Sequence, residues 1–171
     1  LMRVHRVMAF LRFTKKGKSQ ALLHLLKYKN KPEIGEELGR LYGLSLSQHG
    51  FSGLWDVLVA VPLHPLKKAR RGYNQSECFA RGLSKSLGIP VQELLERRKN
   101  TDTQTNKSRL ERLNNVEQVF VLAKGYHASG LRVLLVDDIL TTGATLCAAS
   151  QALLEGGAKH VDLATIAAGG H

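Results

Sequence analysis

The chain has 171 residues, 43% of them hydrophobic, and this length and composition suit one compact domain with its own core rather than a disordered tail. Its 25 Lys and Arg residues against 14 Asp and Glu residues give a formal net charge of +11, which favours anionic partners such as nucleic acid, phosphorylated metabolites or anionic membrane surfaces. No apolar run approaches the roughly 20 residues of a membrane-spanning helix, so we expect no membrane insertion.

The cysteines and histidines give no indication of a metal or disulfide framework. Cys78 and Cys147 are too few and too far apart for a set of disulfides or for a four-ligand zinc site within this chain. The seven histidines are scattered without the spacing of metal ligands, so we interpret each as a surface or packing residue. Because the cysteines do not suggest disulfide bonds, we expect the protein to work in a reducing compartment and to be cytoplasmic.

The first 50 residues predict two helices. Ser19 is a candidate N-cap before Leu22 and Leu26, which are spaced for one helical face, and a second helix is expected after Pro32. The second helix would bury the side chains of Ile34, Leu38, Leu41 and Tyr42. The lysines around the first helix are interpreted mostly as a solvated charged face. They are Lys15, Lys16, Lys18, Lys27, Lys29 and Lys31.

A buried strand and a basic segment are predicted next. The apolar run 57–61 is typical of a strand covered on both faces of a parallel sheet, and Pro62 and Pro65 end it. Residues 67–73 are expected to form a basic loop that leads into a helix over about 74–87.

Residues 97–115 form a long polar stretch that carries six basic side chains and almost no apolar periodicity. Ordered loops of this length are uncommon inside a compact domain, and those that occur are often lids or binding loops. We therefore interpret this stretch as a mobile active-site loop, with an inert surface loop as the alternative.

The most informative segment runs from a strand into a helix near the C-terminus. The buried-type strand 131–136 leads directly into Asp137 and Asp138 and then into a threonine-rich turn. A helix is expected from this turn to about Glu155, and a further apolar strand over 160–166 completes a βαβ unit. Ligands of such sheets bind beyond the carboxyl ends of the strands, where these polar residues fall.

The polar residues at this junction suit a ribose phosphate. Unpaired N–H groups at a helix N-terminus can cradle a phosphate, and threonine hydroxyls add donors from the same side. The turn consists of Thr141, Thr142, Gly143, Ala144 and Thr145. Asp137 and Asp138 can accept hydrogen bonds from ribose hydroxyls and tolerate a nearby divalent cation. The alternative is a solvated strand end followed by an ordinary helix cap.

Residues 133–145 resemble the motif that binds phosphoribosyl pyrophosphate (PRPP) in type I phosphoribosyltransferases, with every motif position filled. Further segments resemble the ComF family, whose members are similar to amidophosphoribosyltransferases in their transferase domain and are associated with bacterial competence and DNA uptake. These segments are Leu26 to Lys29, Val61-Pro62, Arg71 to Gln75 and Thr103 to Val116. The resemblance covers most of the chain.

This resemblance implies an α/β protein with the type I phosphoribosyltransferase fold. Such a fold has a twisted, mainly parallel sheet flanked by helices, here with a small N-terminal helical or hairpin region. Residues 1–50 would form a hood-like region and residues 51–171 the phosphoribosyltransferase-like core of one compact domain. Many ComF-like proteins also carry an N-terminal cysteine-rich zinc element, and this sequence has none.

The resemblance also implies roles for individual residues. Asp137 and Asp138 would contact the ribose of PRPP, and the turn 141–145 would hold its 5-phosphate. Mg²⁺ would arrive with PRPP near the two acids, and no residue is assigned as a certain metal ligand. On the loop that closes over the substrate, Lys107 and Arg109 would be catalytic, excluding water and steadying the leaving group. Pyrophosphate would lie near Leu63, His64, Lys67 and Arg71.

Two functions remain open at this stage. The first is a PRPP-binding protein that transfers or senses a 5-phosphoribosyl group, in which case no residue stands out as a nucleophile or general base. The second is a non-catalytic basic module that holds single-stranded DNA during uptake, although aromatic residues make up only 6% and do not interleave with basic ones. A dinucleotide-binding domain is disfavoured because no G-x-G-x-x-G turn follows either strand.

The candidate partners follow from these two functions. They are PRPP or ribose 5-phosphate, single-stranded DNA, a second copy of the chain and other proteins of the competence machinery. The acceptor nucleophile is not specified by the sequence, because in this fold class a separate hood selects it.

Overall fold

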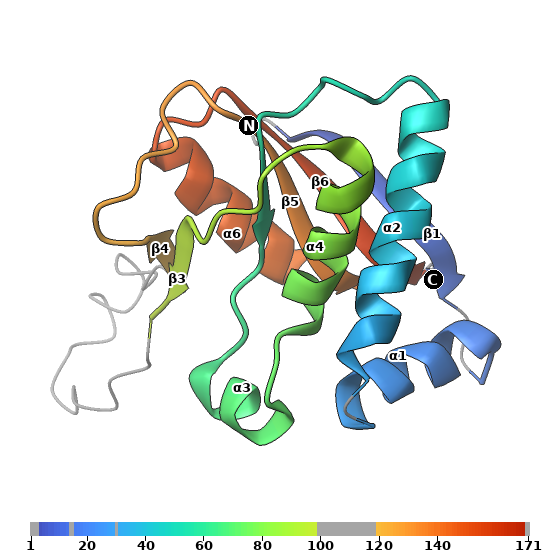
Figure 1. Ribbon diagram of the computed structural model, residues 1–171. Helices are drawn as coiled ribbons and strands as arrows, with labels where there is room; N and C mark the ends of the chain where they lie inside the picture. The colour runs from blue at the N-terminus through green and yellow to red at the C-terminus, as the bar shows by residue number, and fades with distance from the viewer. Residues whose placement is uncertain (1–3, 14–15, 30, 99–118, 170–171) are drawn as a thin grey trace, which may run out of the picture.

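The computed structural model describes residues 4–13, 16–29, 31–98 and 119–169 (Figure 1). Four parallel strands form its main sheet in the order β1-β6-β5-β2. Their bounds are Val4–Phe13 for β1, Val57–Ala60 for β2, Arg132–Leu140 for β5 and His160–Gly169 for β6. The predicted parallel sheet of buried strands is therefore confirmed.

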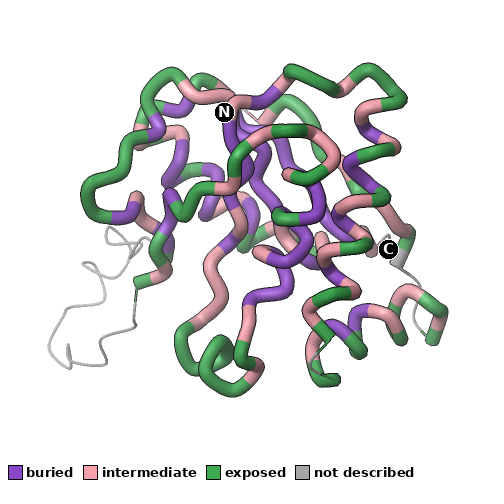
Figure 2. The backbone as a smooth tube through the Cα atoms, viewed as in Figure 1, coloured by how far each residue is buried: buried purple, intermediate pink, exposed green. Residues whose placement is uncertain are grey.

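Helices cover both faces of this sheet. The helices α1 (Lys18–Tyr28), α2 (Pro32–Gln48) and α4 (Gln75–Leu87) share one hydrophobic core with one face. On the other face lie α6 (Ala144–Glu155) and a small antiparallel pair, β3 (Leu95–Arg97) and β4 (Phe120–Leu122). Figure 2 shows that burial is concentrated in the strands of the sheet and in the helix surfaces that face it.

The contact between α2 and α4 depends on glycines. Gly35, Gly39 and Gly43 recur every four residues along one face of α2 and are all buried. A Cβ atom on Gly39 would lie 2.1 Å from the carbonyl oxygen of Phe79, and one on Gly82 would lie 1.9 Å from that of Glu36. The two backbones therefore touch, which fixes the position of α4 against the sheet.

The N-terminal region differs from its prediction in three details. Instead of a hairpin, β1 pairs in parallel with β6 as an edge strand of the main sheet. The N-cap of α1 is Gly17 and not Ser19. The predicted apolar face of α2 is wrong at Leu41, which is 41% exposed, because glycines rather than large side chains face α4. The division between residues 1–50 and 51–171 stays a prediction.

The basic segment after β2 is also different from its prediction. Residues expected to form a loop form the short helix α3 (Pro65–Arg71), with Pro65 in the first turn and Gly72 as a left-handed C-cap at φ 80°. Within the described part of the chain, no helix is long and apolar enough to cross a membrane.

Candidate functional site

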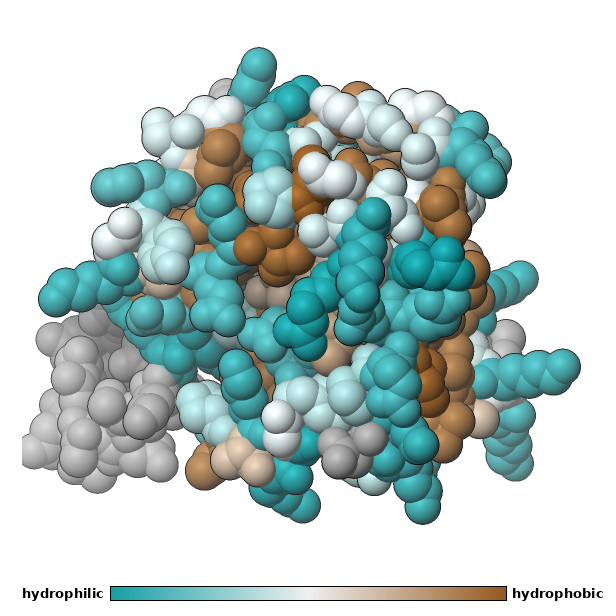
Figure 3. Space-filling model, viewed as in Figure 1, coloured by the Kyte–Doolittle hydropathy of each residue, from teal (hydrophilic) through white to brown (hydrophobic). Residues whose placement is uncertain are grey.

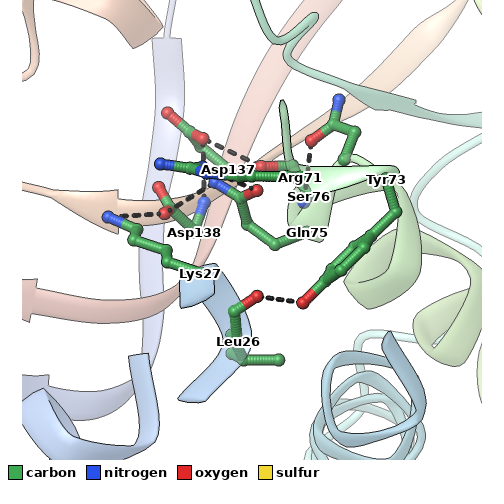
Figure 4. A network of polar contacts seen from close by, with 9 residues as sticks. Leu26, Lys27, Arg71, Tyr73, Gln75, Ser76, Asp137 and Asp138 are labelled. Atoms are coloured by element: carbon green, nitrogen blue, oxygen red, sulfur yellow. Dashed lines mark hydrogen bonds and ion pairs between the residues drawn. The ribbon is translucent and has the colours of Figure 1, made fainter. Parts of the chain in front are cut away.

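Two adjacent carboxylates define the carboxyl end of β5. Asp137 and Asp138 lie within the strand itself, so their backbones are fixed by the sheet. The Asp137 Oδ1 atom accepts hydrogen bonds from the Ser76 hydroxyl at 2.9 Å and from the Asp138 backbone N–H at 2.8 Å. Asp137 is thereby held by local backbone and by the first turn of α4 (Figure 4).

Asp138 is buried and receives its partners from two helices. Its Oδ2 atom accepts a hydrogen bond from the Gln75 Nε2 atom of α4 at 3.1 Å. The same oxygen lies 3.0 Å from the ammonium of Lys27, which belongs to α1 and whose side chain is 25% exposed. Figure 4 shows these three side chains converging on the end of β5.

The N-terminus of α4 is built to hold these partners. Asn74 is the N-cap: its side-chain oxygen accepts from the Ser76 N–H at 3.0 Å, and its side-chain amide donates to the Val61 carbonyl at 3.0 Å. The cap satisfies a free helix donor and ties α4 to the end of β2. Gln75 and Ser76 therefore reach the two carboxylates from a rigid element.

The electrostatics of Asp137 are unusual for an aspartate. Burial, and next the negative charge of Asp138, raise the pKa of Asp137 to about 7. The hydrogen bonds that the protein donates to Asp137 therefore only partly offset the cost of burying its negative charge. Groups of this kind are concentrated at functional sites.

The turn between β5 and α6 is open to solvent. Thr141, Thr142, Ala144 and Thr145 are exposed, and Gly143 is the N-cap of α6 at φ 80°. Glycine has no side chain that could cap α6, so the N–H groups of the first turn are left to other acceptors. The Ala144 N–H makes only a long hydrogen bond of 3.4 Å, to the Thr142 hydroxyl. An anion can approach this helix terminus without displacing a packed side chain.

A basic cavity of about 650 Å³ lies between α1 and α3, next to the carboxylates. Arg71 joins this cavity to the acids, because its guanidinium donates to the Gln75 side-chain oxygen at 3.0 Å and lies 5.7 Å from the ring centre of Tyr28. Hydrophilic side chains gather where these two helices lie in Figure 3. The cavity is lined by Lys27, Tyr28, Lys67, Ala69, Arg70, Arg71 and Gly72.

The four residues predicted for pyrophosphate do not meet at one place. Lys67 and Arg71 line the basic cavity, whereas Leu63 lines a second cavity of about 480 Å³ on the side of α4 and β3. His64 is the N-cap of α3, where its Nδ1 atom accepts from the Leu66 N–H at 3.2 Å. The predicted catalytic residues Lys107 and Arg109 lie outside the described residues.

Three residues of the site were missed from the sequence. Gln75 and Ser76 had a recognisable sign, because they directly follow a strong N-cap residue, Asn74, and Gln75 also ends a segment that resembles ComF. Lys27 lies in another segment that resembles ComF, Leu26 to Lys29, but its basic neighbours favoured a solvated charged face, while the fold pairs it with Asp138.

The described residues alone do not make a metal site. Among them, no group of three or more His, Cys, Asp or Glu side chains comes together. The two adjacent carboxylates offer oxygen ligands that suit Mg²⁺, but Asp138 already has an ammonium beside it. The arrangement fits a Mg²⁺ ion that arrives with a phosphorylated ligand and is held mainly by that ligand.

Comparison with known proteins decides the family. The phosphoribosyl transferase domain family matches residues 73–171, more than half of the chain. The chain belongs to this family. The resemblance of the sequence to type I phosphoribosyltransferases is thereby confirmed.

Curated relatives carry competence and DNA-utilization names, as the resemblance to ComF led us to expect. Competence protein F of Haemophilus influenzae is 33% identical over 148 residues, which cover 83% of this chain and 64% of that protein. DNA utilization protein YhgH of Escherichia coli K12 is 35% identical over 146 residues, with 83% and 63% covered. Competence protein ComFC of Bacillus subtilis is 36% identical over 101 residues, with 59% and 39% covered. The chain spans less than two thirds of the length of these relatives.

Solved structures agree on the fold. Glutamine PRPP amidotransferase from B. subtilis, complexed with ADP and GMP, matches with a TM-score of 0.58 at 23% identity, covering 84% of this chain and 30% of that one. An allosteric regulatory enzyme of purine biosynthesis matches with a TM-score of 0.52 at 23% identity, covering 77% and 26%. The predicted type I phosphoribosyltransferase fold is confirmed.

Proposed function

We propose that the chain binds PRPP together with Mg²⁺ and transfers or senses its 5-phosphoribosyl group. The observation that carries this proposal is the junction of β5 and α6, where the adjacent carboxylates of Asp137 and Asp138 are followed by an exposed, glycine-capped helix start. Acids suit ribose hydroxyls and a helix start suits a phosphate, so the order of the two features along the chain matches a ribose 5-phosphate.

The phosphate end of the ligand would rest on α6. The backbone N–H groups of residues 142–145 and the hydroxyls of Thr141, Thr142 and Thr145 would donate to its oxygens. On binding, the long contact between the Ala144 N–H and the Thr142 hydroxyl would give way to shorter bonds to the phosphate.

The ribose would lie over Asp137 and Asp138, whose free oxygen positions would accept from its hydroxyls. Bound Mg²⁺ would supply charge neutralisation for the phosphate oxygens. Lys67 and Arg71 in the basic cavity would hold the pyrophosphate, and Arg71 is already oriented by Gln75. Leu63 and His64 would serve through the loop backbone after β2.

Transfer would then depend on positioning and charge rather than on a covalent intermediate. Oriented cations stabilise the charge that develops on a departing pyrophosphate, and a fixed ribose reacts from one face only. Lys107 and Arg109 stay the predicted residues that close over the substrate. The cytoplasmic location also stays a prediction.

Calorimetry of PRPP with Mg²⁺ tests the proposal. We expect binding by the intact chain and a loss of about tenfold in affinity for Asp137→Asn and for Thr142→Ala, since each removes one charge-assisted contact. Asp56→Asn is the matched control at the opposite end of the sheet and should bind as the parent does. Absence of binding, or an equal loss in the control, would contradict the proposal. Release of pyrophosphate in the presence of amine or base acceptors separates transfer from sensing.

A second function, the binding of single-stranded DNA, is supported by the basic cavity and by the names of the relatives. Lys67, Arg70 and Arg71 surround an opening beside Tyr28, a ring that is 65% exposed. Gel-shift affinity should fall steeply as salt rises if phosphates are the main contacts, and Arg70→Ala should reduce that slope. A flat salt response would argue against this function.

A further inference from the structure

We propose that Lys27 is a positioning residue of the sugar-phosphate site, whose ammonium fills the place beside Asp138 that a divalent cation would otherwise take. PRPP binding would then need little free Mg²⁺. This inference rests on the proposed function, and it adds that one of the cations at the PRPP site belongs to the protein itself.

The geometry places this ammonium between the acids and the cavity. Lys27 Nζ lies 3.0 Å from Asp138 Oδ2, and the same side chain lines the basic cavity in which Lys67 and Arg71 lie. A cation in this position faces a carboxylate on one side and the expected phosphate groups on the other. In the proposed complex, a position beside a carboxylate and phosphate oxygens is one that a divalent cation would also suit.

The lysine is held in place by its two neighbours on α1. The Tyr73 hydroxyl donates to the Leu26 carbonyl oxygen (Figure 4). The guanidinium of Arg71 lies over the ring of Tyr28, 5.7 Å from its centre. Three consecutive residues of the last turns of α1 thus contact the site. A side chain oriented in this way loses less conformational freedom on binding than a free surface lysine.

Burial separates Lys27 from the nearby lysines Lys29, Lys31 and Lys67, which are exposed. Its side chain is 25% exposed and its partner Asp138 only 9%, whereas the pair of Lys31 and Glu33 is 55% and 65% exposed with its atoms 3.7 Å apart. Screening by water makes the second kind of pair weak, and partial burial strengthens the first. The ammonium also repels a second cation at the same oxygen, so it substitutes for a metal there rather than helping to bind one.

Calorimetry of PRPP with excess Mg²⁺ and with a chelator tests the inference. We expect the wild type to lose less than about tenfold in affinity when Mg²⁺ is removed, and Lys27→Met to lose a further tenfold or so under the chelator but less than about threefold with excess Mg²⁺. Lys27→Arg, which keeps the charge, should restore binding under the chelator. Lys29→Met removes the same net charge from an exposed position and should behave as the wild type.

The outcomes separate the inference from the function on which it rests. If the wild type binds PRPP, but Lys27→Met and Lys29→Met respond to Mg²⁺ alike, the role of Lys27 is wrong and the site stands. An equal loss for Lys27→Met with and without Mg²⁺ also overturns it, because the lysine would then act independently of the metal. If the wild type does not bind PRPP even with excess Mg²⁺, the proposed function itself fails.

Discussion

The two ends of β5 carry charged side chains under opposite conditions. At the amino end, the first residue of β5, Arg132, contacts Asp56, which directly precedes β2. Asp56 accepts hydrogen bonds from the Arg132 guanidinium at 2.7 and 3.1 Å and from its backbone N–H at 2.8 Å, and these contacts lower the pKa of Asp56 to about 2. At the carboxyl end, burial and the charge of Asp138 raise the pKa of Asp137 to about 7.

The difference shows which acids are structural and which are available to a ligand. The protein satisfies Asp56 with a forked donor, so nothing is left for another molecule to supply. Asp137 keeps a costly charge that an incoming donor or cation would stabilise. A carboxylate beside β2 therefore fixes the start of β5, and a carboxylate of β5 itself forms a site at its end.

The site at the carboxyl end of β5 depends first on the position of α4, because this helix brings Gln75 and Ser76 to the two carboxylates. Gly82→Ala would place a Cβ atom 1.9 Å from the Glu36 carbonyl oxygen, where only backbone could yield. We expect a loss of about 3 kcal/mol or more in the free energy of unfolding, measured by denaturant titration. Gly35→Ala, where the nearest atom is a side-chain carbon at 3.1 Å, should stay within about 1 kcal/mol of the wild type. Equal effects at both positions would refute the close helix contact.

The second prediction concerns the cost of the charge on Asp137. Because its pKa is higher in the folded chain than in the unfolded one, the folded state should lose stability as the pH rises from about 4 to about 7. Asp137→Asn removes this loss, and we expect it to be more stable than the wild type at pH 8, by on the order of 2 kcal/mol, and nearly equal at pH 4. Thermal melts across this range measure the difference. A stability difference between Asp137→Asn and the wild type that stays constant at all pH values would show that folding does not disfavour the charge on Asp137.

The third and smallest effect is expected at the amino end, with the opposite sign. The pKa of Asp56 is lowered on folding, so its stabilisation is present above about pH 4 and disappears as the pH falls toward 2. Asp56→Asn should therefore melt below the wild type at pH 7, by less than the Asp137→Asn difference because the pair is open to solvent, and should match it near pH 2. A change in the affinity of this variant for PRPP would contradict the purely structural role of Asp56.

Local patterns were enough to predict the junction of β5 and α6. The apolar run before Asp137 and the glycine after Thr142 lie close together in the sequence. The first indicates a buried strand and the second a helix start, and neither depends on contacts with distant residues. The predicted strand reached only Val136, because sequence alone does not show that the pairing with β6 continues to Leu140.

Features that depend on distant contacts were not predicted. The glycine face of α2 is not evident from the sequence, because large apolar residues mark a buried helix face and this face is instead made of Gly35, Gly39 and Gly43 for close backbone contact. Lys27 resembles its exposed neighbours until the fold places Asp138 beside it. The sequence predicts a loop in place of α3 because the seven residues Pro65–Arg71 are mostly basic and bury no apolar side chain, although Pro65 and Gly72 mark the ends of the helix.

Binding of a sugar phosphate at the start of α6 can be tested by titrating the ¹⁵N-labelled chain with ribose 5-phosphate and following it by NMR. We expect the largest changes in backbone amide shift on residues 142–145 at the start of α6, with smaller changes at Asp137 and Asp138 and none at Asp56 and Arg132. Shifts confined to the basic cavity between α1 and α3, or no shifts at the start of α6, would contradict it.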